Sequence, residues 1–219
     1  MPETPPALPI VDLPLFPLGM VQFPGMPLDL RIFEPRYLQL LDDLADAENP
    51  EFGIVAIVSG HEVGQENLHG MAQTGCAVRI EHQRPTSARV LLRAVGTWRF
   101  DQVEVVDRGT PYLMARVRRL PADPPDAQLA GSVEPLQSAL LAYADAAGIE
   151  LGTIPADPDE LIWWLAAGGP FTQTERLQVL AGQRSERIEL LRGCLRREAM
   201  LLQSTSTVPF QGDRRQSPN

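Results

Sequence analysis

Glu34, Arg36 and Tyr37 place a carboxylate, a guanidinium and a phenol within four consecutive positions. A carboxylate just before a helix can accept hydrogen bonds from the free backbone N–H groups of the first turn, and we expect Pro35 to begin that helix. An arginine can form a two-bond pair with a carboxylate. The three residues therefore either pin a helix to its neighbours or line a groove that binds the polar groups of another chain.

A second set of residues is apolar and flexible. Met20, Phe23 and Met26 surround the turn Phe23-Pro24-Gly25. Thioether side chains adapt to partners of varied shape, which suits the recognition of many different polypeptides. Packing of the same side chains into the core is the competing interpretation. We take the two sets together, Met20, Phe23, Met26, Glu34, Arg36 and Tyr37, as candidate polypeptide-binding residues.

Lysine is absent, so all 19 basic residues are arginine. The chain therefore cannot supply a phosphate-binding P-loop lysine, a Schiff-base lysine or a serine–lysine dyad. Its glycines form neither a G-x-G-x-x-G fingerprint nor a G-x-S-x-G nucleophile elbow. A hydrolase built from serine, histidine and acidic residues stays open as an alternative, because sequence alone does not place these groups in space. We expect a protein that is not an enzyme.

The potential metal ligands have no recognisable spacing. The segment that begins His61-Glu62 lacks the second histidine of an H-E-x-x-H motif, and Cys76 and Cys194 are far apart. His69 and His82 add no pair with ligand spacing. We expect no metal, no cofactor and two reduced cysteines.

The net charge of −9 argues against a general binder of DNA or RNA, because phosphate binding depends on clustered positive charge. Residues 121–171 hold eight acidic residues and no arginine. Five arginines decorate the last predicted helix, and we expect them to form a solvated face: Arg184, Arg187, Arg192, Arg196 and Arg197. The longest apolar run, 161–167, is too short to span a membrane, and no secretory signal opens the chain. We expect a cytoplasmic protein with no membrane contact.

Up to residue 120 the pattern is mostly that of strands. Residues 52–58 are continuously apolar, which predicts a strand buried on both faces. Residues 13–17 contain two prolines, which restricts them to an edge strand or an interrupted one. We expect further strands, separated by turn or glycine signals, at residues 28–33, 74–81, 90–95, 98–106 and 112–120. One helix, starting at Pro35, crosses these strands, so the sequence predicts a small barrel or folded sheet.

After residue 126 the pattern is helical. Ser132 can cap a helix with Pro135 in its first turn, Asp157-Pro158 begins the next, and Thr172 with Glu175 forms a capping box. The longest helix is expected to begin at Ser185. One of the adjacent Trp163 and Trp164 is expected to reach the surface or an interface.

Three linked motifs resemble those of a known family. They are Leu13-Pro14-Leu15-Phe16-Pro17-Leu18, then Phe23-Pro24-Gly25, then Ile32-Phe33-Glu34-Pro35-Arg36-Tyr37. This pattern is similar to the N-terminal substrate-binding domain of ATP-dependent Lon proteases and its free-standing bacterial relatives. The resemblance extends over residues ~10–203. Cys76 stands where a small threonine is more usual after the glycine, and we interpret it as a tolerated core substitution.

The resemblance implies an α+β fold, a PUA-like β pseudo-barrel with one crossing helix followed by a C-terminal helical bundle. We accordingly expect a disordered N-terminus at 1–9, the β domain at 10–120, a linker at 121–126, the bundle at 127–203 and a disordered tail at 204–219. The ATPase and peptidase modules of full-length Lon are not expected here. The implied function is a non-catalytic binding module for polypeptide substrates or protein partners; the alternative is an RNA-binding PUA-like protein. The partner, the binding face and the oligomeric state stay open.

Overall fold

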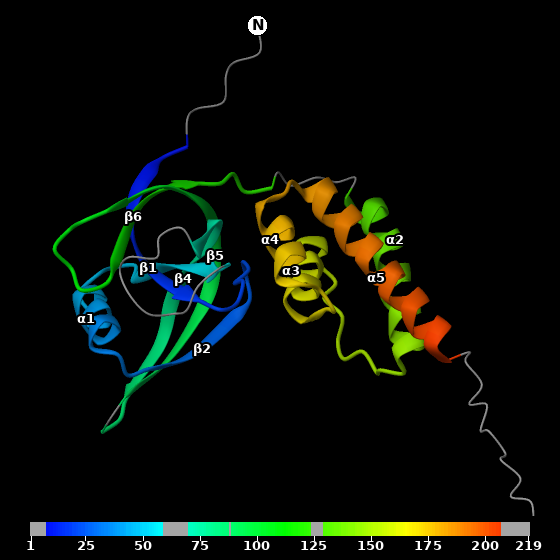
Figure 1. The fold of residues 1–219 in the computed structure, drawn as a ribbon, viewed down its shortest axis with the longest axis horizontal. Coiled ribbons are helices and arrows are strands. Elements are labelled where there is room, and N and C mark those ends of the chain that lie inside the picture. The colour runs from blue at the N-terminus through cyan, green and yellow to red at the C-terminus, as the bar shows by residue number, and fades with distance from the viewer. Residues whose placement is uncertain (1–7, 59–69, 88, 124–128, 207–219) are drawn as a thin grey trace, which may run out of the picture.

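Six strands wrap into a ring in the computed structural model, which describes residues 8–58, 70–87, 89–123 and 129–206. They are β1 (Ile10–Leu18), β2 (Pro27–Ile32), β3 (Glu51–Ile57), β4 (Met71–Pro85), β5 (Val90–Val106) and β6 (Leu113–Arg119). The sheet order is β2-β5-β4-β3-β1-β6, and an additional pairing of β5 with β6 closes the ring (Figure 1). Four helices follow, so the predicted α+β class, with a near-closed barrel before a set of helices, is confirmed.

The first strand, β1, is an internal strand of the sheet and changes its pairing partner at Leu15. Its first part, 10–15, pairs antiparallel with β6, and its second part, 15–18, pairs parallel with β3. Each half of β1 thus lacks a partner on one side, which accommodates the missing N–H groups of Pro14 and Pro17. Of the two predicted types, an edge strand and an interrupted strand, β1 is therefore the interrupted one. A parallel pair needs a crossover connection, and helix α1 (Pro35–Leu44) lies in the connection from β1 to β3.

The predicted break at Gly96 is wrong. β5 runs without interruption through Gly96, and β4 is also longer than expected, so that β4 and β5 form a long antiparallel pair. A glycine is required at position 96 because the backbone of the β1–β2 loop approaches β5 closely there. A Cβ at this position would lie 2.0 Å from the carbonyl oxygen of Phe23. A glycine within a strand pattern often marks such an approach rather than a strand end.

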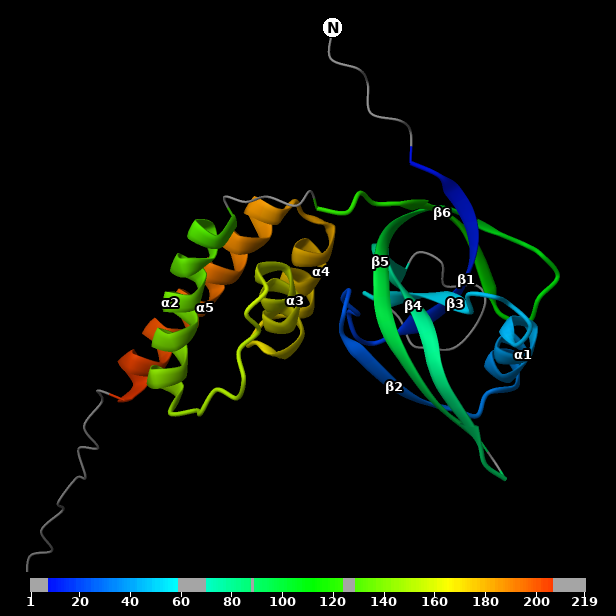
Figure 2. The ribbon, with the colours of Figure 1, turned by 180° about the vertical axis from the view of Figure 1, so that it is seen from behind.

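The helices are α2 (Leu129–Ala147), α3 (Pro158–Gly168), α4 (Gln173–Ala181) and α5 (Arg184–Ser206). The Asp157 cap is confirmed, since its side chain accepts from the N–H groups of Asp159 and Glu160, and the capping box of Thr172 with Glu175 is confirmed too. The Ser132 cap is wrong: α2 begins at Leu129, which places Pro135 inside the helix. Val133, Leu136 and Leu140 on both sides of this proline are buried in the core, and such packing supplies most of the stability of a helix in a protein. α2 and α5 lie side by side and run in the same direction (Figure 2).

The hydrophobic core has three parts, and the largest crosses from the barrel to the helices. Its barrel members are Val21, Phe23, Ala56, Ala72 and Cys76, which pack with buried residues of α2 to α5. A second part lies under α1, and a third has members on β1, β3, β4, β5 and β6. The helices therefore share their core with one end of the barrel.

Residues 1–7, 124–128 and 207–219 lie outside the described part, and with them most of the expected N-terminal segment and tail and half of the expected linker. His61 and His69 lie outside it as well. The division into a β domain and a helical bundle at 121–126 stays a prediction. Within the described ranges, every helix is too short or too polar to traverse a lipid bilayer.

Candidate functional site

The start of α1 holds Glu34, Arg36 and Tyr37 in a compact stack. The Arg36 guanidinium bonds one carboxylate oxygen of Glu34, with N–O distances of 2.7 and 3.0 Å, and lies 4.6 Å above the centre of the Tyr37 ring. The Tyr37 ring is buried and stacks on Phe16 at 3.8 Å between centroids. Glu34 occupies the N-cap position, but its side chain makes no cap hydrogen bond, so the predicted acceptance of backbone N–H groups is wrong. The nearby Arg36 competes for the carboxylate.

The loop between β1 and β2 places Met20, Phe23 and Met26 beside the helices. Phe23 is fully buried, Met26 packs partly buried against the same cluster, and Met20 is 46% exposed. Met20, Phe23 and Met26 line a pocket of about 290 Å³ together with Ala167, Gln173 and Arg176 of the α3–α4 region. We call this the loop–helix pocket. Its volume lies just below the roughly 300–1,000 Å³ of typical small-molecule sites, which suits one protruding side chain.

The two candidate sets lie apart. α1 covers the side of the barrel that faces away from α2 to α5, whereas the loop between β1 and β2, which lines the loop–helix pocket, faces those helices (Figures 1 and 2). Tyr37 belongs to the core cluster under α1, and Phe23 belongs to the cluster shared with the helices. The structure therefore does not bring the six residues into one site.

Hydrogen bonds hold the pocket loop in one conformation. The buried side chain of Gln22 donates to the carbonyl of Met26 at 2.7 Å, and the N–H of Gly25 donates to the carbonyl of Gly96 at 2.9 Å. Gly25 has φ +73°, a left-handed conformation that glycine adopts without steric cost. Gly96 returns an N–H to the carbonyl of Met26 at 3.0 Å. These bonds fix Gly25 and Met26 to β5, and Met20 lies exposed in the same loop.

Arg176 builds the helical wall of the pocket. Its guanidinium donates to four backbone carbonyls, of Ala166, Ala167, Gly169 and Phe171, around the end of α3. A cation is favourable at this helix end because the carbonyls there carry partial negative charge. Burial lowers the pKa of Arg176 from its usual value. Because these carbonyls occupy most of its donors, the pocket presents methionine and alkyl surface to a ligand.

Two buried arginines near Trp163 were missed from the sequence. Arg187 is 1% exposed, pairs with the carboxylate of Asp123 and donates to the carbonyl of Gly182 at 2.7 and 3.0 Å. The prediction that Arg187 belongs to a solvated face is therefore wrong. The sequence spacing could have indicated this burial. Arg187 lies four and eight residues before the buried Leu191 and Leu195, and therefore on the same face of the helix.

Arg99 ties the barrel to the helices. It lies on β5, is 7% exposed and donates to the carbonyl of Leu180 at 2.8 Å and that of Pro121 at 3.1 Å. Burial lowers the pKa of Arg99 to about 10, and repulsion from Arg187 adds to the effect. The guanidinium groups of Arg187 and Arg99 lie 4.4 and 5.7 Å from the centre of the Trp163 ring. Trp163 is buried and Trp164 is partly exposed, which follows from their adjacent positions on α3.

Other arginines of α5 differ in exposure. The Arg184 side chain is only 11% exposed and pairs with Asp159 of α3. Arg197 bonds Glu175 of α4 at 2.6 Å, and Arg196 is exposed. The expected solvated face is therefore correct for Arg196 and Arg197, holds in part for the partly exposed Arg192, and is wrong for Arg184 and Arg187.

The two cysteines are thiols within the core. Burial raises the pKa of Cys76 to about 12, and burial with the adjacent Glu175 raises that of Cys194 to about 11. Neither supplies a thiolate nucleophile at neutral pH. In the described part of the chain, His82 is the only histidine and lies exposed on β4, without a serine or cysteine partner. No three His, Cys, Asp or Glu side chains gather there as a metal site would require.

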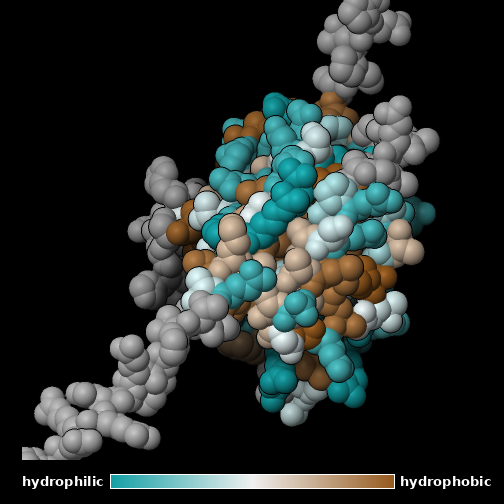
Figure 3. Space-filling view, turned by 90° about the vertical axis from the view of Figure 1, so that its right-hand side faces the viewer, coloured by the Kyte–Doolittle hydropathy of each residue, from teal (hydrophilic) through white to brown (hydrophobic). Residues whose placement is uncertain are grey.

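An apolar area also lies on the helical end of the molecule, where α2 and α5 face the solvent. Hydrophobic residues gather near the middle of this end among hydrophilic ones (Figure 3). The exposed apolar side chains of the two helices are Leu141, Met200 and Leu201, at 56, 62 and 54% exposure. They lie outside the loop–helix pocket.

Comparisons with known proteins identify the family. Residues 12–197 match the family model of the ATP-dependent protease La (Lon) substrate-binding domain. The chain is similar to the structure of a Lon N-terminal domain protein from Xanthomonas campestris, with 28% identity and a TM-score of 0.60 over 84% of this chain and 98% of that one. The fold is also similar to the N-terminal domain of Mycobacterium avium complex Lon protease, at 14% identity and a TM-score of 0.65 over the same shares. A search of curated proteins found no relative. The chain belongs to the Lon substrate-binding domain family.

Proposed function

We propose that the chain is a non-catalytic module that binds polypeptide segments, with the loop–helix pocket as its contact site. The family name supports the class of ligand. The observation that carries the location is the exposure of Met20, at 46%, next to the buried residues Val21, Gln22 and Phe23 of a hydrogen-bonded loop. A flexible thioether on a hydrogen-bonded loop offers adaptable apolar contact at little ordering cost to the protein.

The absence of catalytic chemistry is part of the proposal. The chain contains no lysine, and its two cysteines have pKa values of about 12 and 11. The family match also covers a substrate-binding domain alone. These observations support a protein that holds a polypeptide without cleaving it or hydrolysing ATP.

The test is the binding of a permanently unfolded polypeptide. A reduced and carboxymethylated model protein is immobilised, and binding of the chain is measured at high salt, where surface charges are screened. We expect the double variant Met20→Ser/Met26→Ser to bind at least about tenfold more weakly, since burying a single methionine is worth about 1.5–3 kcal/mol and about 1.4 kcal/mol is a factor of ten.

Met200→Ser is the control, because Met200 is 62% exposed, does not line the pocket and lies near the C-terminal end of α5, which points away from the barrel (Figure 1). It should leave binding unchanged. Binding no stronger than that of an unrelated acidic protein at every salt concentration would refute the function. Equal losses in both variants would refute the location.

A further inference from the structure

A strongly basic surface lies on the arm formed by β2, β5 and β4. In the register of the sheet, Arg31 is opposite Leu91, which is opposite Arg84, so the three side chains point to the same face. Two residues further along, Arg93 lies between Asp29 and His82. The other face of the arm carries Leu28, Leu92 and Ala94, which are buried under α1. The face with Arg31 is therefore the outer one.

Five arginines share this outer face and its tip: Arg31, Arg79, Arg84, Arg89 and Arg93, all exposed. Three acidic residues accompany them: Asp29, Glu81 and Glu51, which is opposite Arg79 in the register of β3 and β4. The one ion pair within the described part of the arm joins Arg93 and Glu81 at 3.9 Å. The whole chain carries a net charge of −9, so this concentration of positive charge opposes the general balance. We call it the basic arm face.

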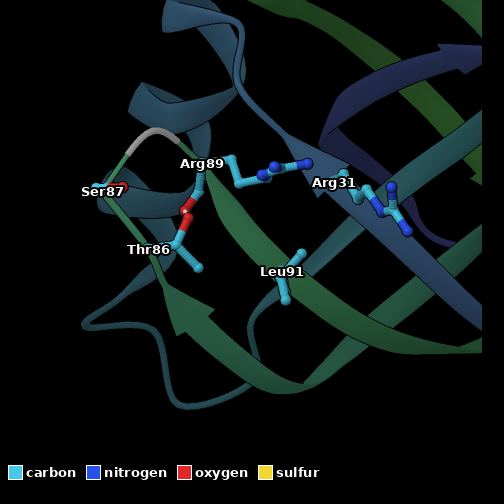
Figure 4. A pocket seen from close by; sticks show the side chains of 5 residues that line it. All are labelled: Arg31, Thr86, Ser87, Arg89 and Leu91. Atoms are coloured by element: carbon cyan, nitrogen blue, oxygen red, sulfur yellow. Dashed lines mark hydrogen bonds between the residues drawn. The ribbon is translucent and has the colours of Figure 1, made fainter.

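The basic arm face includes a pocket at the hairpin tip. It has a volume of about 420 Å³ and is lined by Arg31, Thr86, Ser87, Arg89 and Leu91. Figure 4 shows the Arg89 side chain extending from the tip toward Arg31 across the pocket. The Thr86 hydroxyl donates to the carbonyl of Arg89 at 2.8 Å, which fixes the turn. Like charges held near each other on a sheet are unfavourable, and an anion between them removes that repulsion.

From this arrangement we infer that the basic arm face binds acidic stretches of a polypeptide. Guanidinium groups match carboxylates in planar two-bond pairs, and the net charge of −9 opposes the approach of the long phosphate backbone of a nucleic acid. The arm also projects away from the barrel, where an extended chain can approach it (Figures 1 and 2). The inference rests on the proposed polypeptide-binding function and adds a preference for substrates with acidic segments.

The test is the fluorescence anisotropy of a labelled glutamate-rich peptide titrated with the chain. We expect saturable binding at low ionic strength that weakens steeply through about 0.1 M salt, where the screening length falls to about 10 Å. Arg31→Gln/Arg89→Gln should weaken binding about tenfold. Arg118→Gln/Arg196→Gln is the matched control, with the same change of net charge at exposed positions on β6 and α5, and should bind like the unchanged chain. Circular dichroism confirms that the variants are folded.

Three results overturn the inference: no binding of the peptide, equal losses in the two double variants, or tighter binding of a single-stranded RNA that depends on Arg31 and Arg89. The last result assigns the face to nucleic acid. The unfolded-protein assay at high salt separates this inference from the proposed function. Binding there that depends on Met20 and Met26, together with no peptide binding, refutes only the acidic preference.

Discussion

The rings of Phe23 and Trp163 stack with 5.9 Å between their centroids, which joins the pocket loop of the barrel to helix α3. Both residues are buried in the core cluster that the barrel shares with the helices. The loop that exposes Met20 therefore keeps its position through an aromatic contact with the helical part. The shape of the loop–helix pocket depends on this contact.

Phe23→Ala is expected to lower the free energy of unfolding by about 3–5 kcal/mol, because it leaves a cavity at the shared core. Chemical denaturation followed by circular dichroism measures the change. Phe33→Ala is the control: Phe33 is 68% exposed, and its removal should change stability by no more than about 0.5 kcal/mol. Similar small losses for both would show that the shared core does not form.

Arg187→Met is expected to destabilise the fold by about 3–5 kcal/mol, since it leaves the Asp123 carboxylate without its buried partner. Arg192 lies on the same helix and pairs with Glu189 at the surface, so Arg192→Met should cost about 0–1 kcal/mol. Thermal unfolding of the two variants decides between a buried pair and a surface one. Equal shifts would argue against burial of Arg187.

Two glycine substitutions are expected to have opposite signs. Gly96→Ala forces a methyl group against the Phe23 carbonyl, so the loop must shift and stability falls. Gly193 lies in α5 with nothing within 4 Å of a Cβ, so Gly193→Ala should raise stability by about 0.5–1 kcal/mol. Denaturation midpoints of the two variants test the signs. A neutral Gly96→Ala would contradict the close approach of loop and strand.

Glu175 should contribute to acid sensitivity. Its bond with Arg197 holds the pKa of this carboxylate at about 2, below the usual 4.5. A carboxylate whose folded-state pKa is lowered stabilises the fold above pH 4.5, and this stabilisation is lost as the pH falls toward about 2. Glu175→Gln should therefore flatten the dependence of unfolding free energy on pH in that window. An unchanged slope would contradict the bonded state of Glu175.

The sequence predicted the elements whose signals are local. The caps at Asp157 and Thr172 depend on residues two or three positions apart, and the structure confirms both. Gly96 was wrongly predicted as a strand break. Its role is a contact with Phe23, more than 70 positions earlier, and no local pattern reveals such a contact. The Arg187 partner Asp123 is likewise 64 positions away.

The candidate site was predicted in part for the same reason. The candidate residues lie in the loop between β1 and β2 and at the start of α1. The pocket also requires Ala167, Gln173 and Arg176 from the helical half of the chain. Arg176 acts through four carbonyl contacts that depend on the path of the chain after α3. The residue types of the pocket can be recognised in the sequence. Whether the loop residues and the helix residues lie together depends on how the helices pack against the barrel.

Site-specific crosslinking tests the central claim most directly. A photoreactive amino acid replaces Met20 in one variant and Met200 in another, and each is irradiated with an unfolded, carboxymethylated polypeptide at high salt. We predict strong crosslinks from position 20 and background levels from position 200, because only the first borders the loop–helix pocket. Crosslinks from position 200 alone, or from neither position, would contradict polypeptide binding at this pocket.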